Sequence, residues 1–325
     1  MTTLDHIQDS IRPQIDELNQ LIADVLLNSY SSLTNTIVTQ YLHTKGKQIR
    51  PILVLLSGKF FGGITRKVLD AAAAIEMLHN ASLIHDDVID RSKERRGSPT
   101  INSIWDNHIA VLVGDYFVGG ALKCAVNTGD VRILNALSRL GTDLSIGEID
   151  QIEYAQHRDI DEQLYMRVIG RKTASLFTSC VELGGLAADA PQQALDDLKR
   201  FAQLLGLCFQ IKDDTFDYYN DPIIGKPTGN DLREGKVTLP LIYALGRTDL
   251  PEHDEMMALL NKEAPSSEDI DRLIDFAKRA GGIDYAYETM ERLRDEANTI
   301  LSPYQPDETI DQFREIFDYV IERRL

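Results

Sequence analysis

The order of apolar and polar residues predicts long helices over most of the chain. Proline is absent between Pro99 and Pro191, and the residues between them are rich in Ala, Leu, Ile, Glu and Arg, which favour helix. Residues 195–217 carry apolar side chains near helical spacing, and residues 68–90 include an alanine run of high helix propensity. Sustained alternation with a period of two is absent from the sequence, so a sheet is not expected. The pattern therefore predicts an all-α fold.

Glycine, proline and charge mark where the predicted helices end. A helix is expected to end at Gly184 and Gly185, because glycine commonly follows the last helical residue. Residues 92–100 and 220–235 are rich in Gly, Pro and charge and are predicted to be loops. Residues 252–325 have the pattern of further amphipathic helices.

Length and charge limit what the protein can be. A chain of 325 residues allows two domains or one large one, and because no stretch resembles a linker we expect a single all-α domain, 1–325. Basic residues number 34 and acidic residues 51, which gives a formal net charge of −17. This charge disfavours nucleic acid and anionic membrane as partners. An anionic ligand therefore needs a local basic patch or metal ions.

The spacing of the cysteines and the length of the apolar runs favour a cytoplasmic protein. The three cysteines, Cys124, Cys180 and Cys208, lie far apart, which argues against a zinc site or a disulfide framework and favours a reducing environment. The N-terminal residues lack the pattern of a signal peptide. Uninterrupted apolar runs such as residues 52–56 are too short to span a bilayer, so we expect no transmembrane segment and a cytoplasmic protein.

Two aspartate clusters lie at the ends of predicted helices. Residues four apart share a helix face, so Asp86 lies above Asp90 in the first cluster. Asp213 and Asp217 have the same spacing in the second. A solvated helix end explains one such cluster equally well, but two copies on apolar helices favour a cation that neutralises them, and Mg²⁺ leaves room for substrate phosphates. The candidate metal ligands are Asp86, Asp87, Asp90, Asp213, Asp214 and Asp217.

Basic residues accompany both clusters, although the chain as a whole is acidic. Surface salt bridges are one explanation for this arrangement. The alternative is a polyphosphate site, where carboxylates hold Mg²⁺ while Mg²⁺, Lys and Arg hold the phosphates. The glycine spacing of a Walker-type loop is absent from the sequence. The candidate phosphate-binding residues are Lys47, Arg50, Arg95, Arg96, Lys172, Lys226 and Lys236.

In this combination of motifs the chain resembles the trans-type polyprenyl diphosphate synthases, also called polyprenyl synthetases. The similarity covers roughly residues 40–245, and five signals occur in the family's order. The signals are Gly46-Lys47 with Arg50-Pro51, Asp86 to Asp90 with Arg95-Arg96-Gly97, Lys172-Thr173, Phe209 to Asp217, and Lys226 with Lys236. Lys45 and Gln48 depart from the family's pattern beside Lys47. The resemblance implies one all-α helical bundle of the isoprenoid synthase type around a central cavity.

The resemblance also implies a role for each matching residue. Asp86 and Asp90 would bind Mg²⁺, as would Asp213, to make about three ions per site with substrate bound. Asp87, Asp214 and Asp217 would assist. The allylic diphosphate would contact Arg95, Lys172, Lys226 and Lys236. Isopentenyl diphosphate would contact Lys47, Arg50, His79 and Arg96, and the oxygens of Thr173 and Gln210 would face the carbocation. Members of the family are commonly homodimers, and we expect the same here.

The helix before Asp86 indicates product length. If it lines the cavity, positions 81–82, 78 and 74–75 form a stripe at about 6, 12 and 18 Å from Asp86. Short-chain members of the family carry a bulky aromatic at the first level, where this chain has small residues. We therefore expect a medium-to-long prenyl product. The residues that set its length are Ala81, Ser82, Leu78, Met77 and Ala74.

Four alternatives remain open at this point. A short-chain synthase that makes geranylgeranyl or farnesyl diphosphate would use the same motifs. A terpene cyclase would not need a second anion site without metal. A non-catalytic subunit of a heteromeric synthase usually lacks one aspartate cluster, whereas both are complete here. A purely structural helical protein would not require these motifs together.

Overall fold

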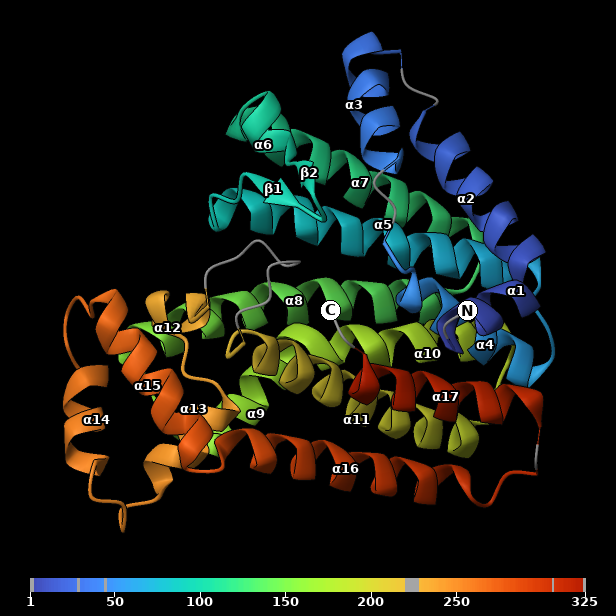
Figure 1. The fold of residues 1–325 in the computed structure, drawn as a ribbon. Coiled ribbons are helices and arrows are strands. Elements are labelled where there is room, and N and C mark those ends of the chain that lie inside the picture. Colours follow the sequence, from blue (N-terminus) through green and yellow to red (C-terminus); the bar gives the residue numbers. More distant parts are fainter. Residues whose placement is uncertain (1–2, 28–29, 44–45, 220–227, 306, 324–325) are drawn as a thin grey trace. The chain divides into compact units, whose positions relative to one another are not determined.

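The computed structural model describes residues 3–27, 30–43, 46–219, 228–305 and 307–323. Helices account for nearly all regular structure in these ranges, and the strands found there are two of two residues each (Figure 1). The prediction of an all-α fold is confirmed. The chain divides into two compact units, each built from several separate stretches. The prediction of a single domain over 1–325 stays a prediction, because this division does not test it.

The first unit comprises residues 1–142, 176–199 and 306–313. Its helices are α1 (Thr3–Ser10), α2 (Arg12–Leu26), α3 (Ser32–His43), α4 (Ile49–Phe61), α5 (Arg66–Ile89), α6 (Ile101–Ile104), α7 (Asn107–Asn127) and nearly all of α10 (Ser175–Ala187). It also contains the strands β1 (Glu94–Arg95) and β2 (Ser98–Pro99).

The second unit comprises residues 143–175, 200–305 and 314–325. It contains α9 (Glu162–Ile169), the π-helical segment η1 (Gly170–Ala174), α12 (Asn230–Arg233), α13 (Leu239–Gly246), α14 (His253–Leu260), α15 (Ser267–Arg279) and α16 (Gly282–Leu301). Three helices contribute residues to both units: α8 (Val131–His157), α11 (Gln192–Phe216) and α17 (Glu308–Glu322).

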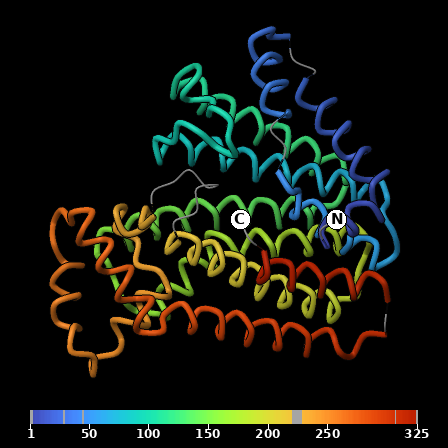
Figure 2. The backbone as a smooth tube through the Cα atoms, viewed as in Figure 1, coloured from blue at the N-terminus to red at the C-terminus, as the bar shows by residue number. Residues whose placement is uncertain are grey.

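Helix α5 is the central element of the first unit and lies alongside α7, with α2 and α4 also against it (Figures 1 and 2). Its alanine run, residues 71–74, is fully buried, because side chains this small allow neighbouring helices to approach closely. A Cβ on Gly120 of α7 would lie 2.9 Å from the sulfur of Met77, so this glycine makes room for the α5 side chain. Thr65 caps the start of α5 by accepting a hydrogen bond from Val68 N.

One helix end differs from its prediction. Gly184 and Gly185 do not end a helix but lie buried inside α10. A Cβ on Gly184 would lie 2.3 Å from the backbone oxygen of Val54 in α4, and Ser57 of α4 donates to Val181 O at 2.8 Å. Close packing between α4 and α10 therefore requires glycine here, which outweighs its local tendency to end helices.

Helix α7 is long and apolar enough to span a membrane by length and composition alone. Polar residues interrupt its apolar positions, so the helix contains no long uninterrupted apolar run. One such helix is weak evidence, since the core helix of a soluble protein passes the same test. Eight residues of α7 are buried in the first unit: Ala110, Val113, Gly114, Phe117, Gly120, Ala121, Cys124 and Ala125. In the apolar window of α7, 44% of the residues are buried.

Candidate active site

The first aspartate cluster lies at the end of α5, as predicted, with Asp90 at the capping position after Ile89. Its three carboxylates differ in exposure. Asp87 is buried and accepts a hydrogen bond from Arg95 Nε at 2.8 Å. Asp86 is half-buried and Asp90 is exposed. Asp86 and Asp90 are therefore the members that a solvated cation can reach, whereas Asp87 holds an arginine.

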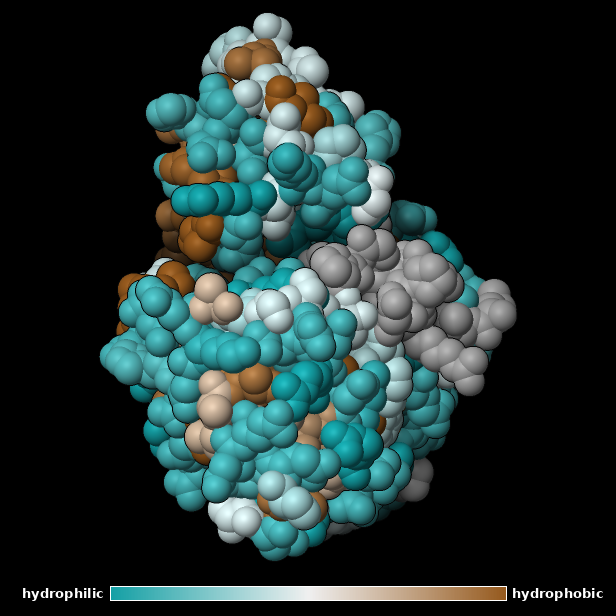
Figure 3. Space-filling view, turned by 60° about the vertical axis from the view of Figure 1, so that its left-hand side comes forward, coloured by the Kyte–Doolittle hydropathy of each residue, from teal (hydrophilic) through white to brown (hydrophobic). Residues whose placement is uncertain are grey.

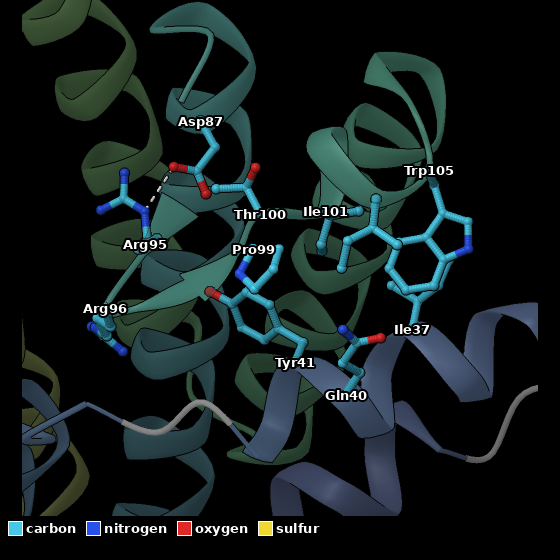
Figure 4. Close-up of a pocket in the computed structure, with 11 residues that line it drawn as sticks. Ile37, Gln40, Tyr41, Asp87, Arg95, Arg96, Pro99, Thr100, Ile101 and Trp105 are labelled. Atoms are coloured by element: carbon cyan, nitrogen blue, oxygen red, sulfur yellow. Dashed lines mark hydrogen bonds and ion pairs between the residues drawn. The ribbon is translucent and has the colours of Figure 1, made fainter. Parts of the chain in front are cut away.

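A small hairpin after α5 presents both arginines of the first motif. Residues 92–100 were predicted to be a loop, but β1 and β2 pair antiparallel there, joined by Arg96 and Gly97, both with positive φ (54° and 72°). Two such residues make the tight turn that matches strand twist. Asn102 fastens the hairpin to α5 by donating to the backbone oxygens of Asp87 and Ser92. Arg95 is thereby directed at Asp87 (Figure 4).

The hairpin turn also brings Arg96 to the segment before α4. A Cβ on Gly46 would lie 2.5 Å from the guanidinium carbon of Arg96, so a side chain there would displace this guanidinium. Lys47 is exposed and follows directly. Arg50 lies on α4 with its guanidinium carbon 5.4 Å from the centre of the Phe177 ring. The structure thus brings two predicted isopentenyl diphosphate ligands, Arg96 and the Gly46-Lys47 segment, together within the first unit.

Three residues that the sequence analysis did not single out line a cavity of ≈ 250 Å³ beside Arg96. Tyr41 donates to Asn80 Oδ1 at 3.3 Å, and Asn80 donates to Glu76 Oε1 at 3.4 Å. Burial raises the pKa of Glu76, and the charge of Arg50 opposes that rise. A partly buried carboxylate here stabilises the arginines around it.

His79 of α5 is 5% exposed, and neither of its ring nitrogens has a hydrogen-bond partner. Burial, followed by the charges of Arg50 and Arg96, lowers the pKa of His79 well below its ordinary value. The ring is therefore neutral near pH 7, with one nitrogen able to donate and the other to accept. Unsatisfied buried polar atoms are uncommon, and they fit the predicted contact to a substrate.

The predicted chain-length residues fall on two faces of α5. Ala74, Met77 and Ala81 are fully buried or nearly so, and Met77 contacts the Gly120 position of α7. Ser82 and Leu78 are half-buried and lie one and two turns, respectively, before Asp86 on the same face. The latter pair is therefore the better candidate for the wall of a substrate cavity.

The second aspartate cluster lies at the end of α11 in the second unit, and its members again differ. Asp213 is half-buried and paired with Arg323, which follows α17. Asp214 is buried, with both oxygens accepting hydrogen bonds, from Tyr165 and Gln210. Asp217 lies one residue beyond α11.

The carboxylate of Asp217 accepts from Asn230 N at 2.9 Å and Asp231 N at 3.0 Å, so it caps the start of α12. Burial raises the pKa of Asp217, and these backbone hydrogen bonds oppose the rise. Asp213 and Asp217 are both half-buried, and they have different partners: Arg323 pairs with Asp213, whereas Asp217 caps α12.

The motif Lys172-Thr173 lies in the π-helical segment η1. Lys172 Nζ is 2.5 Å from Glu148 Oε2 of α8, and Thr173 Oγ1 donates to Gln210 Oε1 of α11 at 2.6 Å. A Cβ on Gly147 would lie 2.8 Å from the backbone of Lys172, so α8 approaches η1 as closely as glycine permits. Single π-helical turns inside α-helices are frequent at functional sites.

These residues share a cavity of ≈ 160 Å³ in the second unit. The predicted residues on its wall are Lys172, Thr173, Gln210, Asp214 and Lys236. Lys236 Nζ is 2.7 Å from Glu234 Oε2. Lys226 lies outside the described residues. Two lysines and two uncharged oxygens around one cavity suit a ligand with a phosphate end beside an electron-poor centre.

The donor set fits a hard divalent cation only when a substrate adds further ligands. Among the described residues there is no group of three or more His, Cys, Asp or Glu side chains arranged to hold a metal ion. Asp86 and Asp90 of the first unit and, separately, Asp213 of the second are at least partly exposed, and Mg²⁺ is commonly bound by one or two carboxylates plus substrate phosphates and water.

Residues distant in sequence hold the predicted site residues in place. Glu148 pairs with Lys172, Tyr165 with Asp214 and Arg323 with Asp213. Each partner lies on a different element, so no spacing rule connects them. Arg323 follows α17 and is only 10% exposed.

The chain matches the family model described as "Polyprenyl synthetase" over residues 31–277. It is 34% identical over 275 residues to "Heptaprenyl diphosphate synthase component 2" of Bacillus subtilis, covering 84% of this chain and 78% of that one. The solved structure of a decaprenyl diphosphate synthase from Rhodobacter capsulatus is similar at a TM-score of 0.91 and 30% identity, covering 98% of each chain.

A polyprenyl synthase from Caulobacter crescentus, solved in complex with calcium and isoprenyl diphosphate, is similar at a TM-score of 0.90 and 28% identity over 99% of this chain and 98% of that one. The solved structures match nearly the whole chain and the family model matches residues 31–277, in agreement with the motifs and the helical fold. The chain therefore belongs to the polyprenyl synthetase family.

Proposed function

We propose that this protein is a trans-prenyltransferase that condenses isopentenyl diphosphate with an allylic diphosphate, farnesyl or geranylgeranyl diphosphate, to give a medium- or long-chain all-trans polyprenyl diphosphate. Relatives that make heptaprenyl and decaprenyl products support this product class. The observation that carries the proposal is the pairing of Thr173 with Gln210 in a cavity that also holds Lys172 and Lys236.

In this reaction the allylic C–O bond breaks and the diphosphate leaves with the electron pair. The alkene of isopentenyl diphosphate then attacks the cation, and a proton is lost. Lys172 would exchange Glu148 for the diphosphate, while the lone pairs of Thr173 and Gln210 stabilise the positive charge. We infer that the released diphosphate accepts the proton.

The proposed metal ion is Mg²⁺, at about three ions per site with substrate bound. Members of this family use a divalent metal, and the Caulobacter crescentus relative was solved with calcium. When bound, the ions neutralise the leaving diphosphate. The residues proposed to hold them are Asp86, Asp90 and Asp213, whose carboxylates are accessible. Asp87, Asp214 and Asp217 would hold neighbouring groups instead.

We further propose that the enzyme is a cytoplasmic homodimer. Helix α7 exposes four large apolar side chains within an arc of about 100°: Val111, Leu112, Leu122 and Val126. Figure 3 shows that such apolar areas interrupt a mostly hydrophilic surface. The three cysteines are free and buried, which suits a reducing compartment.

A heteromeric enzyme is the second candidate, because the Bacillus subtilis relative is named as component 2. Light scattering, which gives the mass of the assembly, and an activity assay on the purified chain together separate the two candidates. A dimer that is active by itself supports the homodimer, and a chain that is active only after addition of a partner supports the heteromer.

Initial rates of labelled isopentenyl diphosphate incorporation test the reaction and its residues together. Asp86→Asn and Asp213→Asn should each lower kcat by about 10³-fold, because each removes a charged ligand of the leaving group's counterion. Asp275→Asn, which changes an exposed carboxylate on α15, is the matched control and should be fully active. Full activity in both cluster variants would contradict the proposed site.

A further inference from the structure

Four side chains of the second unit form one continuous hydrogen-bonded chain. Tyr165 OH of α9 donates to Asp214 Oδ2 at 2.6 Å. Gln210 Nε2 donates to Asp214 Oδ1 at 2.7 Å, one helical turn away on α11. Thr173 Oγ1 of η1 donates to Gln210 Oε1 at 2.6 Å. The chain runs from a phenol to the hydroxyl group proposed to face the carbocation.

The direction of each hydrogen bond follows from the residue at its centre. The Gln210 amide could be turned in two ways, but the reverse orientation would set its carbonyl oxygen against Asp214 Oδ1. In the structure the Gln210 nitrogen donates to Asp214 and its carbonyl oxygen accepts from Thr173. Burial raises the pKa of Asp214 well above its ordinary value. The Thr173 hydroxyl has one proton, which it donates to Gln210. Both lone pairs of its oxygen therefore remain available to accept or to stabilise positive charge.

Burial keeps this arrangement fixed. Tyr165, Asp214 and Thr173 are 3%, 6% and 8% exposed, so water does not compete for these hydrogen bonds. Burial also raises the pKa of Tyr165 well above its ordinary value, which keeps the phenol protonated and donating. Both oxygens of Asp214 accept hydrogen bonds from protein donors and the residue is only 6% exposed, which disfavours a metal ion there.

We propose that Tyr165 and Asp214 are positioning residues, which fix the Gln210 amide and through it direct the lone pairs of Thr173 toward the developing allylic cation. The inference rests on the proposed prenyl transfer and extends it. It removes Asp214 from the set of metal ligands, although it lies between Asp213 and Asp217. It also gives Tyr165 a role in the ionisation step without contact to substrate.

Tyr165→Phe removes only the hydroxyl that holds Asp214 Oδ2. We expect kcat to fall by up to about tenfold, the size of one buried hydrogen bond, with the KM of both substrates unchanged. Tyr218→Phe is the matched control, because its buried hydroxyl pairs with Thr238 and not with this chain of side chains. The control should keep the wild-type rate. Equal rates in Tyr165→Phe and wild type would overturn the inference.

Asp214→Asn separates positioning from metal binding. Positioning predicts a lower kcat at saturating Mg²⁺, with the Mg²⁺ concentration for half-maximal rate within about twofold of wild type. A metal ligand predicts a half-saturating concentration that rises at least about tenfold. The second result would overturn the inference. Thermal unfolding of each variant shows whether it is folded. If Asp214→Asn does not fold, the result for Tyr165→Phe tests the inference.

A double-mutant cycle measures whether the effects of two substitutions on kcat are coupled. A merely structural role of Tyr165 would not produce this coupling. Thr173→Val should remove the catalytic effect of the whole series of hydrogen bonds from Tyr165 to Thr173. Adding Tyr165→Phe to Thr173→Val should therefore lower kcat no further. Tyr165→Phe combined with Lys236→Ala should instead lower kcat by the product of the single effects. Independent effects of Tyr165→Phe and Thr173→Val would overturn the inference while prenyl transfer stands. If the wild-type protein does not catalyse prenyl transfer, the proposed function is refuted, and the positioning role is refuted with it.

Discussion

The guanidinium of Arg323 donates a hydrogen bond to Asp213 Oδ1, a carboxylate oxygen of the second aspartate cluster. Arg323 also donates to the backbone oxygen of Phe209 at 3.1 Å and lies 4.0 Å from the centre of that ring. A residue beyond the last helix thus holds a predicted metal ligand from the end of α11. Any cation at Asp213 has to share the carboxylate with this arginine or displace it.

Arg323→Gln should therefore make the metal easier to bind. Loss of the positive charge is expected to lower the Mg²⁺ concentration for half-maximal rate by about three-fold, a modest effect because the carboxylate is partly solvated. Arg200→Gln removes the same charge from an exposed pair with Glu296 and should leave the titration unchanged. A higher Mg²⁺ requirement in Arg323→Gln would show that the arginine assists metal binding.

Gly147→Ala should damage catalysis by moving η1. The added methyl would lie 2.8 Å from the backbone of Lys172, so α8 or η1 has to shift. A displacement of about 1 Å at a catalytic group lowers kcat by about 100-fold. Gly141→Ala on the same helix meets nothing within 4 Å and should retain activity with equal or higher stability. Equal rates in the two variants would show that the close approach has no catalytic role.

Ser82→Phe should shorten the product, because Ser82 is half-buried on the same face of α5 as Asp86. Leu78→Ala, one turn deeper, should lengthen it by removing bulk from the same stripe. Ala81 is 1% exposed, so a tyrosine there should lower the melting temperature rather than act as a chain-length floor. Products are sized as prenols after phosphatase treatment. An unchanged product length in both Ser82→Phe and Leu78→Ala would show that this stripe of α5 does not set the product length.

The buried His79 should make stability depend on pH. Because the folded pKa lies below the unfolded value of about 6.5, the unfolded chain binds the proton more readily as pH falls. The stability conferred by neutral His79 is therefore present above about pH 6.5 and is lost below it, by at most about 1.4 kcal/mol per pH unit. His79→Gln should lose less stability than wild type in urea unfolding between about pH 7.5 and 5.5.

His108→Gln is the control for this measurement, since the His108 side chain is 93% exposed. It should follow the wild-type pH dependence. An identical slope in His79→Gln and wild type would mean that His79 takes up its proton in the folded state.

Local rules account for the parts of the structure that could be predicted. The end of α5 carries Asp86 and Asp90 on one face because four-residue spacing fixes that geometry in any helix. The role of Gly184 could not be found in this way, since the backbone of Val54 that requires it is distant in sequence. Asp217 likewise depends on α12, whose first amides it caps. The sequence therefore indicates which groups carry the chemistry, while tertiary packing decides which partners hold them.

The most direct test of the account is one incubation of the purified chain with labelled isopentenyl diphosphate, farnesyl diphosphate and Mg²⁺, with the products sized after phosphatase treatment. We predict a medium- or long-chain all-trans prenol that disappears when a chelator is added. A single short product would keep prenyl transfer but contradict the assignment of Ser82 and Leu78. Absence of any condensation product from the folded chain would contradict the proposed activity.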